Sequence, residues 1–346
     1  MPSAILRSRM PAPAFWLAAA MAAALAPFLE PFAGWLDPMR TVKLLPVAAA
    51  AALAIAFYRL LGALDANRRR QRAAAWLALP LMACHALLLG GTNALQAAAC
   101  VTAVAMAIER RHAVMFAWWG IAIAFAVQAL LLAPFFLALA IRRRISALWL
   151  ALPVALLAVR LSGALPDLAA DTSSSAPNIW SLAAALAPEH APALLGIALA
   201  AGLGAAAAYI ARMQSIVTDR AALAGMAALA TLLAAGLLPQ MGAQDFLLPG
   251  ILTLALAVAR GTRNAFTLAA LVQLGTIAAA FGFGLELTAA GTLCMIAATW
   301  IAAQPLIAPH ANDNRDGSHA IPLPHGLRGT LSFDMVSRPA VWPRGE

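Results

Sequence analysis

Carboxylates are the side chains of this sequence that are best suited to acid–base chemistry. Seven of them stand between long apolar runs, in stretches that hold few basic residues. They are Glu30, Asp37, Asp167, Asp171, Glu189, Asp245 and Glu286. A carboxylate beside a substrate hydroxyl can act as a general base. The alternative is that these acids only occupy loops that exclude Lys and Arg, and that Asp37-Pro38 is only a turn.

A second group of polar residues lies in or beside the apolar runs and carries amide side chains. Its members are Asn93, Gln96, Gln128, Gln273 and Gln304. Glutamines at such places usually form hydrogen bonds between neighbouring helices. Arg160 stands near the outer end of another apolar run, where it either reaches the interface or pairs with an acid or a ligand phosphate.

The sequence lacks the residues that several kinds of chemistry require. No glycine-rich phosphate loop, nucleotide fingerprint or nucleophile motif is present, so ATP-driven transport is not predicted. His85 has no second ligand at metal-binding spacing, and no paired spacing joins the three cysteines, Cys84, Cys100 and Cys294. The sequence therefore predicts no metal site, no disulfide and no cofactor.

The composition is that of an integral membrane protein. Of 346 residues, 63% are hydrophobic and 11% are charged, and the mean hydropathy is +0.84. No soluble domain of this size has such a composition. The net charge of +9 lies in short clusters between apolar runs, which marks cytoplasmic loops rather than a nucleic-acid surface. We expect an all-α, polytopic integral membrane protein with about 10–12 transmembrane helices.

Two topologies are possible for the long uncharged run of residues 113–141. A single helix of this length would measure roughly 43 Å, against a hydrocarbon core of about 30 Å. If the run instead turns near residues 126–128 and the N-terminus is cytoplasmic, 16 Lys and Arg residues before the C-terminal tail lie inside and 3 outside. A single helix gives 10 inside and 9 outside. The split is therefore predicted, with both termini cytoplasmic and with Asn93 and Gln128 near the outer face in neighbouring turns.

Two further segments are distinguished by their composition. Residues 309–346 contain Pro, Gly, His, Asn and Asp without an apolar period, so we expect a disordered cytoplasmic tail after a transmembrane domain of residues 1–308. The longest outer loop, residues 162–190, carries Pro177-Asn178-Ile179-Trp180. Asn178 is expected to cap a short interfacial helix over residues 179–186 that packs on the outer helix ends.

Several stretches resemble motifs of the GT-C superfamily, polytopic glycosyltransferases whose bacterial members are related to the dolichol-linked mannosyl- and glucosyltransferases. Four carry the resemblance: Thr41-Val42-Lys43-Leu44-Leu45, Gly90-Gly91-Thr92-Asn93-Ala94-Leu95, the segment from Trp119-Gly120 through Val127-Gln128-Ala129 to Ala133-Pro134-Phe135, and Ala176-Pro177-Asn178-Ile179-Trp180. A fifth stretch resembles the family's Pro-x-Met-His-Glu-Arg-Tyr-Phe segment: Leu238-Pro239-Gln240-Met241-Gly242-Ala243-Gln244-Asp245-Phe246.

The resemblance implies a multi-pass enzyme of the bacterial inner membrane. Such enzymes take a sugar from a polyprenyl-phosphate carrier on the outer face and transfer it to a lipid or glycan acceptor in envelope polysaccharide or glycolipid assembly. The family keeps its catalytic Asp in the first outer loop, which gives that role to Asp37. The matched motifs imply these substrate-binding residues: Asn93, Gln128, Asn178, Trp180, Gln244 and Asp245. The expected partners are the bilayer, the carrier-linked sugar and the acceptor, and not a nucleic acid.

Charged positions of the family motifs are neutral in this sequence. Gly91 and Asn93 stand where the family has Gln and Asp. Its His, Glu and Arg correspond to Gly242, Ala243 and Gln244. The motif around the family's catalytic Asp has no counterpart. Because neutral groups hold an anionic donor weakly, an inactive pseudoenzyme is one alternative. A non-catalytic membrane scaffold or accessory subunit is another, and a transporter is a third.

Overall fold

The computed structural model describes residues 38–65, 91–164, 177–186, 190–214, 219–239, 241–281 and 285–307. These residues are almost entirely helical and contain no strand, which confirms the all-α prediction. Contacts divide the chain into two units, Met1–Ile307 and Ala308–Glu346. The predicted tail of residues 309–346 lies outside the described residues.

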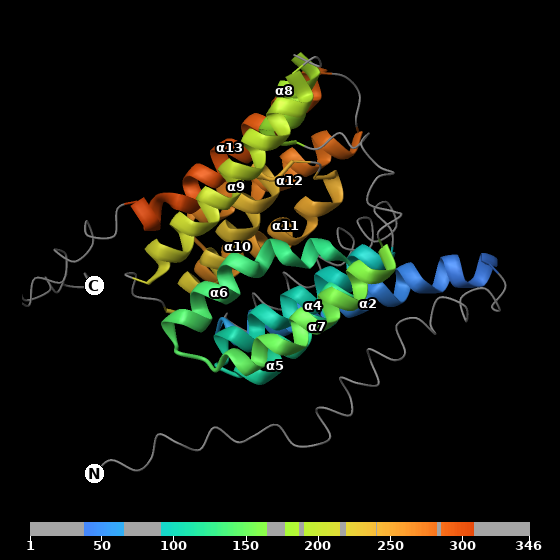
Figure 1. Ribbon diagram of the computed structural model, residues 1–346, viewed down its shortest axis with the longest axis vertical. Coiled ribbons are helices and arrows are strands. Elements are labelled where there is room, and N and C mark those ends of the chain that lie inside the picture. Colours follow the sequence, from blue (N-terminus) through green and yellow to red (C-terminus); the bar gives the residue numbers. More distant parts are fainter. Residues whose placement is uncertain are drawn as a thin grey trace, which may run out of the picture. The chain divides into compact units, whose positions relative to one another are not determined.

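The described helices follow one another from residue 38 to residue 307 (Figure 1). In chain order the α-helices are α2 (Pro38–Ala63), α4 (Gly91–Ile108), α5 (His112–Phe125), α6 (Ala133–Arg142), α7 (Ala151–Ala164), α8 (Ile179–Leu186), α9 (Ala191–Met213), α10 (Arg220–Leu237), α11 (Leu247–Arg260), α12 (Arg263–Phe281) and α13 (Leu285–Ile307). Three short 3-10 helices lead into α6, α7 and α11: η1 (Val127–Leu132), η2 (Ala147–Leu150) and η5 (Ala243–Phe246).

Three helices of the described residues are long and apolar enough to cross a membrane. They cover Ala193–Met213, Arg220–Leu237 and Glu286–Pro305. Large apolar side chains of these helices point outward, since Leu203 is 68% exposed and Leu293 is 65% exposed. Apolar surface of this kind is normally covered by a partner or by lipid rather than left in water. These helices therefore point to membrane association, whereas the polytopic arrangement remains a prediction.

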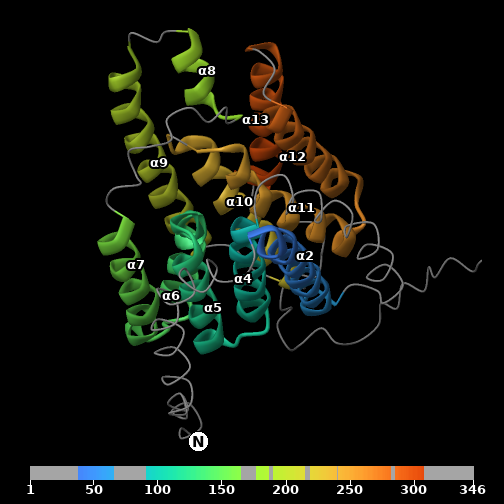
Figure 2. The same cartoon turned by 90° about the vertical axis from the view of Figure 1, so that its right-hand side faces the viewer.

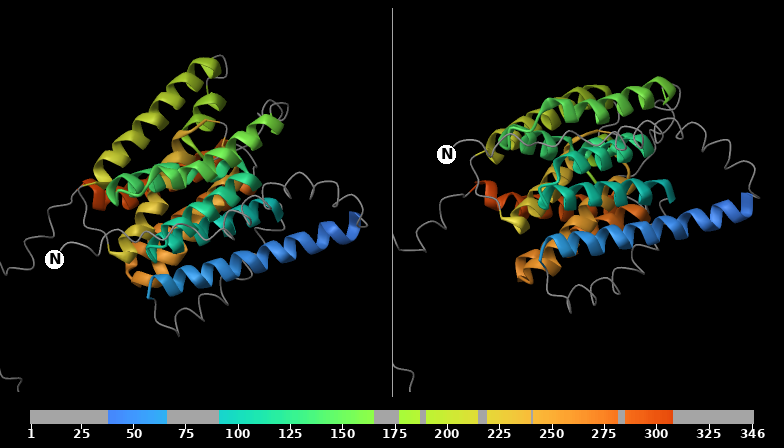
Figure 3. Two further views of the ribbon diagram at one scale, coloured as in Figure 1. Left: turned by 60° about the horizontal axis from the view of Figure 1, so that its bottom comes forward. Right: turned by 90° about the horizontal axis from the view of Figure 1, so that it is seen from below.

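Most neighbours in the sequence are also neighbours in space. α4 packs between α2 and α5, and α5 also packs against α7. Figures 2 and 3 show these helices side by side. In the second half of the chain, α10 contacts α9 and α11, and α12 contacts α11 and α13. Contacts of α11 with α2 and α4 join the two halves.

The uncharged run of residues 113–141 is divided into two helical segments, as predicted. α5 ends at Phe125, Ala126 is extended (φ −158°, ψ 141°), and the chain returns through η1 into α6. The indole Nε1 of Trp119 donates a hydrogen bond to the oxygen of Ala129 (2.9 Å). The ring centroids of Trp119 and Phe136 lie 5.0 Å apart, so α6 folds back along α5. An indole N–H buried in an apolar layer needs such a partner.

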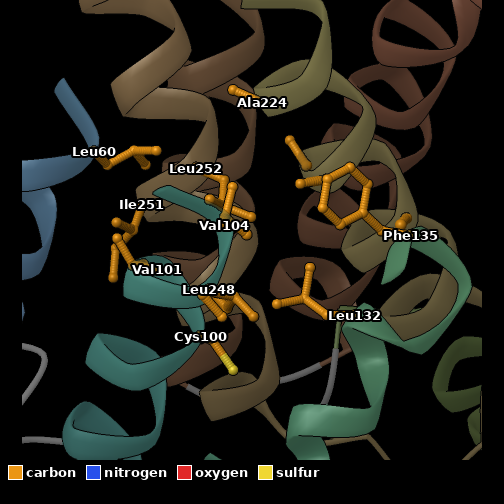
Figure 4. Close-up of a cluster of buried hydrophobic side chains, with 14 of the residues drawn as sticks. Leu60, Cys100, Val101, Val104, Leu132, Phe135, Ala224, Leu248, Ile251 and Leu252 are labelled. Carbon is orange, nitrogen blue, oxygen red and sulfur yellow. The ribbon is translucent and has the colours of Figure 1, made fainter. Parts of the chain in front are cut away.

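Aliphatic and aromatic side chains from several helices form one core beneath this reversal (Figure 4). Cys100 and Val104 come from α4, Leu132 from η1, Phe135 from α6, and Leu252 from α11. All five side chains are buried. The core therefore fixes α4, η1, α6 and α11 relative to one another.

Basic turns that are far apart in the sequence lie next to one another. Three contacts join them: the hydrogen bond from Arg143 Nη1 to the Ala107 oxygen (3.0 Å), the hydrogen bond from Arg142 Nη1 to the Met213 oxygen (2.8 Å), and the ion pair of Arg220 with Asp65. The last residues of α2, α4, α6 and α9 and the start of α10 are thus at a common end. This grouping is what the charge-based topology requires of loops on one side.

Two of these helix ends carry an arginine in the left-handed region, Arg110 with φ 62° and Arg144 with φ 50°. Each one closes a terminal turn with a backbone bond that spans five residues: Arg111 N to the Met106 oxygen and Ile145 N to the Ala140 oxygen, both 2.9 Å. Glycine or asparagine is the usual residue at such a position. A side chain with a Cβ costs roughly 1–2 kcal/mol there.

α12 and α13 pack backbone against backbone at Gly275 and Gly291. A Cβ atom built on either glycine would lie 3.1 Å from the backbone oxygen of the other. Small residues at such crossings allow apolar helices to approach closely. Both positions therefore require glycine, because a larger side chain would crowd the backbone of the facing helix.

We expect Gly291→Leu to lower the free energy of unfolding by about 1–3 kcal/mol, because the new side chain has to separate two backbones. Gly204→Leu in α9 is the matched control, since nothing lies within 4 Å of a Cβ there. The control should be neutral or slightly stabilising. Thermal unfolding of the purified protein in detergent measures both variants, and equal effects of the two substitutions would contradict the close approach.

Candidate functional site

A polar cleft opens where the first turns of α4, η1 and α11 meet. The cleft is small: the centre of a water molecule can occupy about 10 Å³ of it, within about 230 Å³ of empty space that includes open solvent. Its lining combines amides, one carboxyl and apolar side chains: Asn93, Gln96, Ala97, Gln128, Leu131, Gln244, Asp245, Leu247 and Leu248. Four of these residues, Asn93, Gln128, Gln244 and Asp245, were predicted from the sequence as substrate-binding residues. The structure brings these four together in one place.

Each polar group reaches the cleft through a local feature of the chain. Asn93 and Gln96 are three residues apart on α4, so they lie on the same face of its first turns. Gln128 stands two residues after the extended residue Ala126, so the reversal carries it into the cleft. Gln244 and Asp245 belong to η5, the 3-10 turn that joins α10 to α11. Sequence spacing alone does not bring these three segments together.

One hydrogen bond links two sides of the cleft. Asn93 Nδ2 donates to Gln244 Oε1 at 3.3 Å, across 151 residues of sequence. Gln244 is exposed, whereas Gln96 is only 8% exposed. The cleft therefore carries amide groups both at its mouth and at its floor, and each amide can donate and accept.

Asp245 is the only titratable residue among the described residues that line the cleft. Its side chain is 6% exposed, and its Oδ2 accepts a hydrogen bond from the Gly242 N–H at 2.7 Å, which closes η5. Burial raises the pKa of the carboxyl from its ordinary 3.8 to about 6, while the hydrogen bond from Gly242 acts in the opposite direction. A carboxyl with such a pKa can exchange protons near neutral pH.

Asn178 and Trp180, the other two predicted binding residues, do not line this cleft. Asn178 caps α8, since its Oδ1 accepts from the Ser181 N–H at 2.7 Å, and α8 begins and ends where the sequence predicted. Trp180 Nε1 donates to the Leu237 oxygen at 2.7 Å. α8 also contacts α9 and α13, so this part of the segment from 162 to 190 packs on neighbouring helices as expected.

The roles of these two residues are therefore structural in the described part of the chain. Leu237 is the last residue of α10, and the connection that follows leads to Gln244 and Asp245. The Trp180 indole thus holds the end of α10, and the chain continues from there to η5 at the cleft. Asp37, the predicted catalytic residue, lies outside the described residues.

Sequence reasoning treated Gln96 as a packing amide and missed its place in the cleft. The signal was present, because Gln96 follows Asn93 by three residues on a helix. No family model matches the chain, and a search of curated proteins finds no matching relative. The resemblance to GT-C glycosyltransferases therefore rests on the quoted motifs and remains a prediction.

Folding stability should depend on the ionisation of Asp245. The carboxyl binds its proton more tightly in the folded chain (pKa about 6) than in the unfolded chain (3.8), so its contribution is greatest below about pH 4 and is lost as pH rises through 6. The full difference corresponds to about 3 kcal/mol.

Asp245→Asn keeps an oxygen for the Gly242 N–H but does not titrate. Melting temperatures of the two proteins between pH 4 and 8 should therefore diverge: the variant gains relative to the wild type as pH rises from 4 to about 6, and the difference stays constant above that. Parallel curves would show that burial does not perturb this carboxyl.

Loss of the indole hydrogen bond should loosen α8. Trp180→Phe keeps an aromatic ring but leaves the Leu237 oxygen without its donor, at a cost of about 1 kcal/mol. Limited proteolysis should then cut within residues 177–186 faster than in the wild type. Trp300→Phe is the control, because Trp300 is 60% exposed on α13. Equal cutting of the wild type and both variants would indicate that the bond does not hold α8.

Proposed function

We propose that this chain is a membrane glycosyltransferase-like protein that binds a polyprenyl-phosphate-linked sugar at the cleft between α4, η1 and η5. The observation that carries the proposal is the convergence of Asn93, Gln128, Gln244 and Asp245 in that cleft. Motif positions spread over more than 150 residues lie together there, as the parts of one binding site would.

The chemical character of the cleft suits a sugar. Sugar hydroxyls both donate and accept hydrogen bonds, and so do the amides of Asn93, Gln96, Gln128 and Gln244. Leu131, Leu247 and Leu248 form the apolar part of the wall. A few convergent polar groups on an apolar wall are typical of small-molecule sites.

Asp245 supplies the acid–base group that transfer requires. The acceptor hydroxyl attacks the anomeric carbon, the bond between that carbon and the phosphate oxygen breaks, and the polyprenyl phosphate leaves with the bonding pair. The hydroxyl proton passes to the Asp245 carboxylate. A pKa of about 6 leaves most of this carboxyl ionised at pH 7 and able to accept the proton. Asp37 remains the catalytic residue implied by the resemblance.

The proposed setting is the bacterial inner membrane, with several spanning helices and both termini in the cytoplasm. The apolar helices support it, and so does the charge asymmetry between the two ends of the described helices. Arginine-rich turns gather at the ends of α4 and α6, while the cleft lies beside the first turns of these helices. With the arginines inside, the cleft faces outward, where carrier-linked sugars are used.

A second candidate is a non-catalytic subunit that keeps the sugar site. The described residues that line the cleft include no Lys, Arg or His, so no cation among them holds the phosphate of a donor. An enzyme working on such a donor would be expected to neutralise that charge.

Transfer and binding separate the two candidates. The purified chain in lipid nanodiscs is incubated with radiolabelled polyprenyl-phosphate mannose or glucose and a bacterial lipid extract as acceptor. An enzyme should transfer label, and Asp245→Asn should slow transfer by about 10²–10⁴-fold. Asp37→Asn should have an equally large effect if Asp37 is the base. Donor binding without transfer supports the non-catalytic subunit.

Substitutions of single amides test the cleft itself. Asn93→Ala and Gln128→Ala should each weaken donor binding by about 3–10-fold, the worth of one hydrogen bond. Gln304→Ala is the matched control, because this exposed amide of α13 does not line the cleft. Wild-type binding by both cleft variants, or no donor binding by the intact chain, would overturn the proposal.

A further inference from the structure

A compact arginine cluster lies at the connections from α4 to α5 and from α6 to η2, which are neighbours at the lower end of Figure 2. Five arginines and one glutamate belong to it: Arg110, Arg111, Arg142, Arg143, Arg144 and Glu109. The Arg143 guanidinium joins the two connections, because its Nη1 donates to the Ala107 oxygen at the end of α4. The proposed sugar site makes no use of this cluster.

Like charges converge within the cluster. Burial lowers the pKa of Arg143, and the charges of Arg110 and Arg142 lower it further. The one carboxylate of the cluster, Glu109, pairs with Arg111 at 3.3 Å. Arg110 and Arg142 thus lie within electrostatic range of Arg143, and none of the three forms an ion pair with a carboxylate of the described residues. An anion at this place would relieve their mutual repulsion.

A further polar atom at the cluster has no partner. The side chain of His112 lies within electrostatic range of Arg143 and Arg110. Its Nδ1 is buried and makes no hydrogen bond to any described residue. Buried polar atoms in folded proteins nearly always have a partner, so a ligand atom at this place would satisfy it.

Exposed apolar side chains stand within a few residues of the cluster in the chain. Ile141, one residue before Arg142, is 59% exposed. Leu148 of η2 is 63% exposed, and Val114 in the first turn of α5 is 37% exposed. A ligand that fits both parts has a negative head and an apolar body. A free phosphate or a nucleotide would use only the arginines.

We infer that Arg110, Arg142 and Arg143 bind the phosphate of an anionic phospholipid, whose acyl chains lie along the apolar surface formed by Val114, Ile141 and Leu148. Guanidinium groups match phosphate oxygens in geometry and charge. Basic clusters at the cytoplasmic ends of membrane helices are known to recognise anionic lipids. The inference rests on the proposed membrane setting and is independent of sugar transfer.

The variants are chosen to remove charge without disturbing the fold. Arg110 has φ 62°, a backbone conformation that asparagine adopts more readily, so Arg110→Asn should keep the turn. Arg143→Gln keeps an N–H₂ group for the Ala107 oxygen. The control is Arg260→Gln with Arg263→Gln, which removes the same number of charges at the exposed turn between α11 and α12.

The experiment measures binding of fluorescent phosphatidylglycerol and phosphatidylcholine to the purified chain in detergent, with circular dichroism as the test of folding. The wild type and the Arg260/Arg263 variant should prefer phosphatidylglycerol. The double variant Arg110→Asn, Arg143→Gln should bind it about tenfold or more weakly while its helical signal is unchanged. If the double variant does not fold, Arg110→Asn alone takes its place, with a smaller expected loss.

Three results would overturn the inference. The first is equal binding of the two lipids by the wild type. The second is an equal loss of binding in the cluster variant and the control variant, which would indicate general attraction between charges. The third is complete displacement of phosphatidylglycerol by millimolar inorganic phosphate, which would identify a site for a soluble anion. Because no sugar is present, these outcomes do not depend on whether the chain transfers one.

Discussion

The reversal at Ala126 is the constraint on which the arrangement of the first half of the chain depends. An uncharged run too long for one membrane crossing has to turn, and a turn inside an apolar layer must satisfy its own polar groups. The indole of Trp119 does part of this by donating to the Ala129 oxygen beyond the break. Its ring also contacts Phe136 of α6, which itself packs mainly against α9. Because α6 comes back along α5, its last residues reach the end of α4, where Arg143 bonds to Ala107.

The same reversal gives the described helices two chemically different ends. Gln128, two residues after the break, enters a cleft lined by amides, while Arg142 and Arg143 are carried to the opposite end. Moving a charge into a hydrocarbon layer is costly, whereas a neutral amide costs much less when it finds a partner. The distance of the arginine-rich turns from this cleft is what a chain surrounded by lipid would require. Arg110 and Arg144 keep their charge in a backbone conformation that favours glycine, which adds a strain of about 1–2 kcal/mol at each position.

Local rules allowed parts of this structure to be predicted from the sequence. The cap at Asn178 and the bounds of α8 follow from an asparagine before an apolar stretch. The turn near residue 126 follows from the length of the uncharged run. The partners of Trp180 and Gln244 could not be predicted, because each depends on how distant helices pack. The Trp180 indole bonds to the end of α10, and Gln244 meets Asn93 across 151 residues. Gln96 was missed because its type alone indicated packing.

The position of Asp245 links the stability of the fold to the chemistry of the cleft. One carboxyl oxygen is engaged by the Gly242 N–H and closes the turn before α11. That hydrogen bond favours the charged form, yet the pKa still rises to about 6, so burial is the stronger influence. A carboxylate held this way is less stable than a carboxylate in water. A ligand that donates a hydrogen bond to it would therefore stabilise it. A sugar or acceptor hydroxyl is such a donor, and its binding would offset part of the cost of burying the charge. Closing the turn needs only the hydrogen bond to Gly242 and does not require Asp245 to line a cleft with amides.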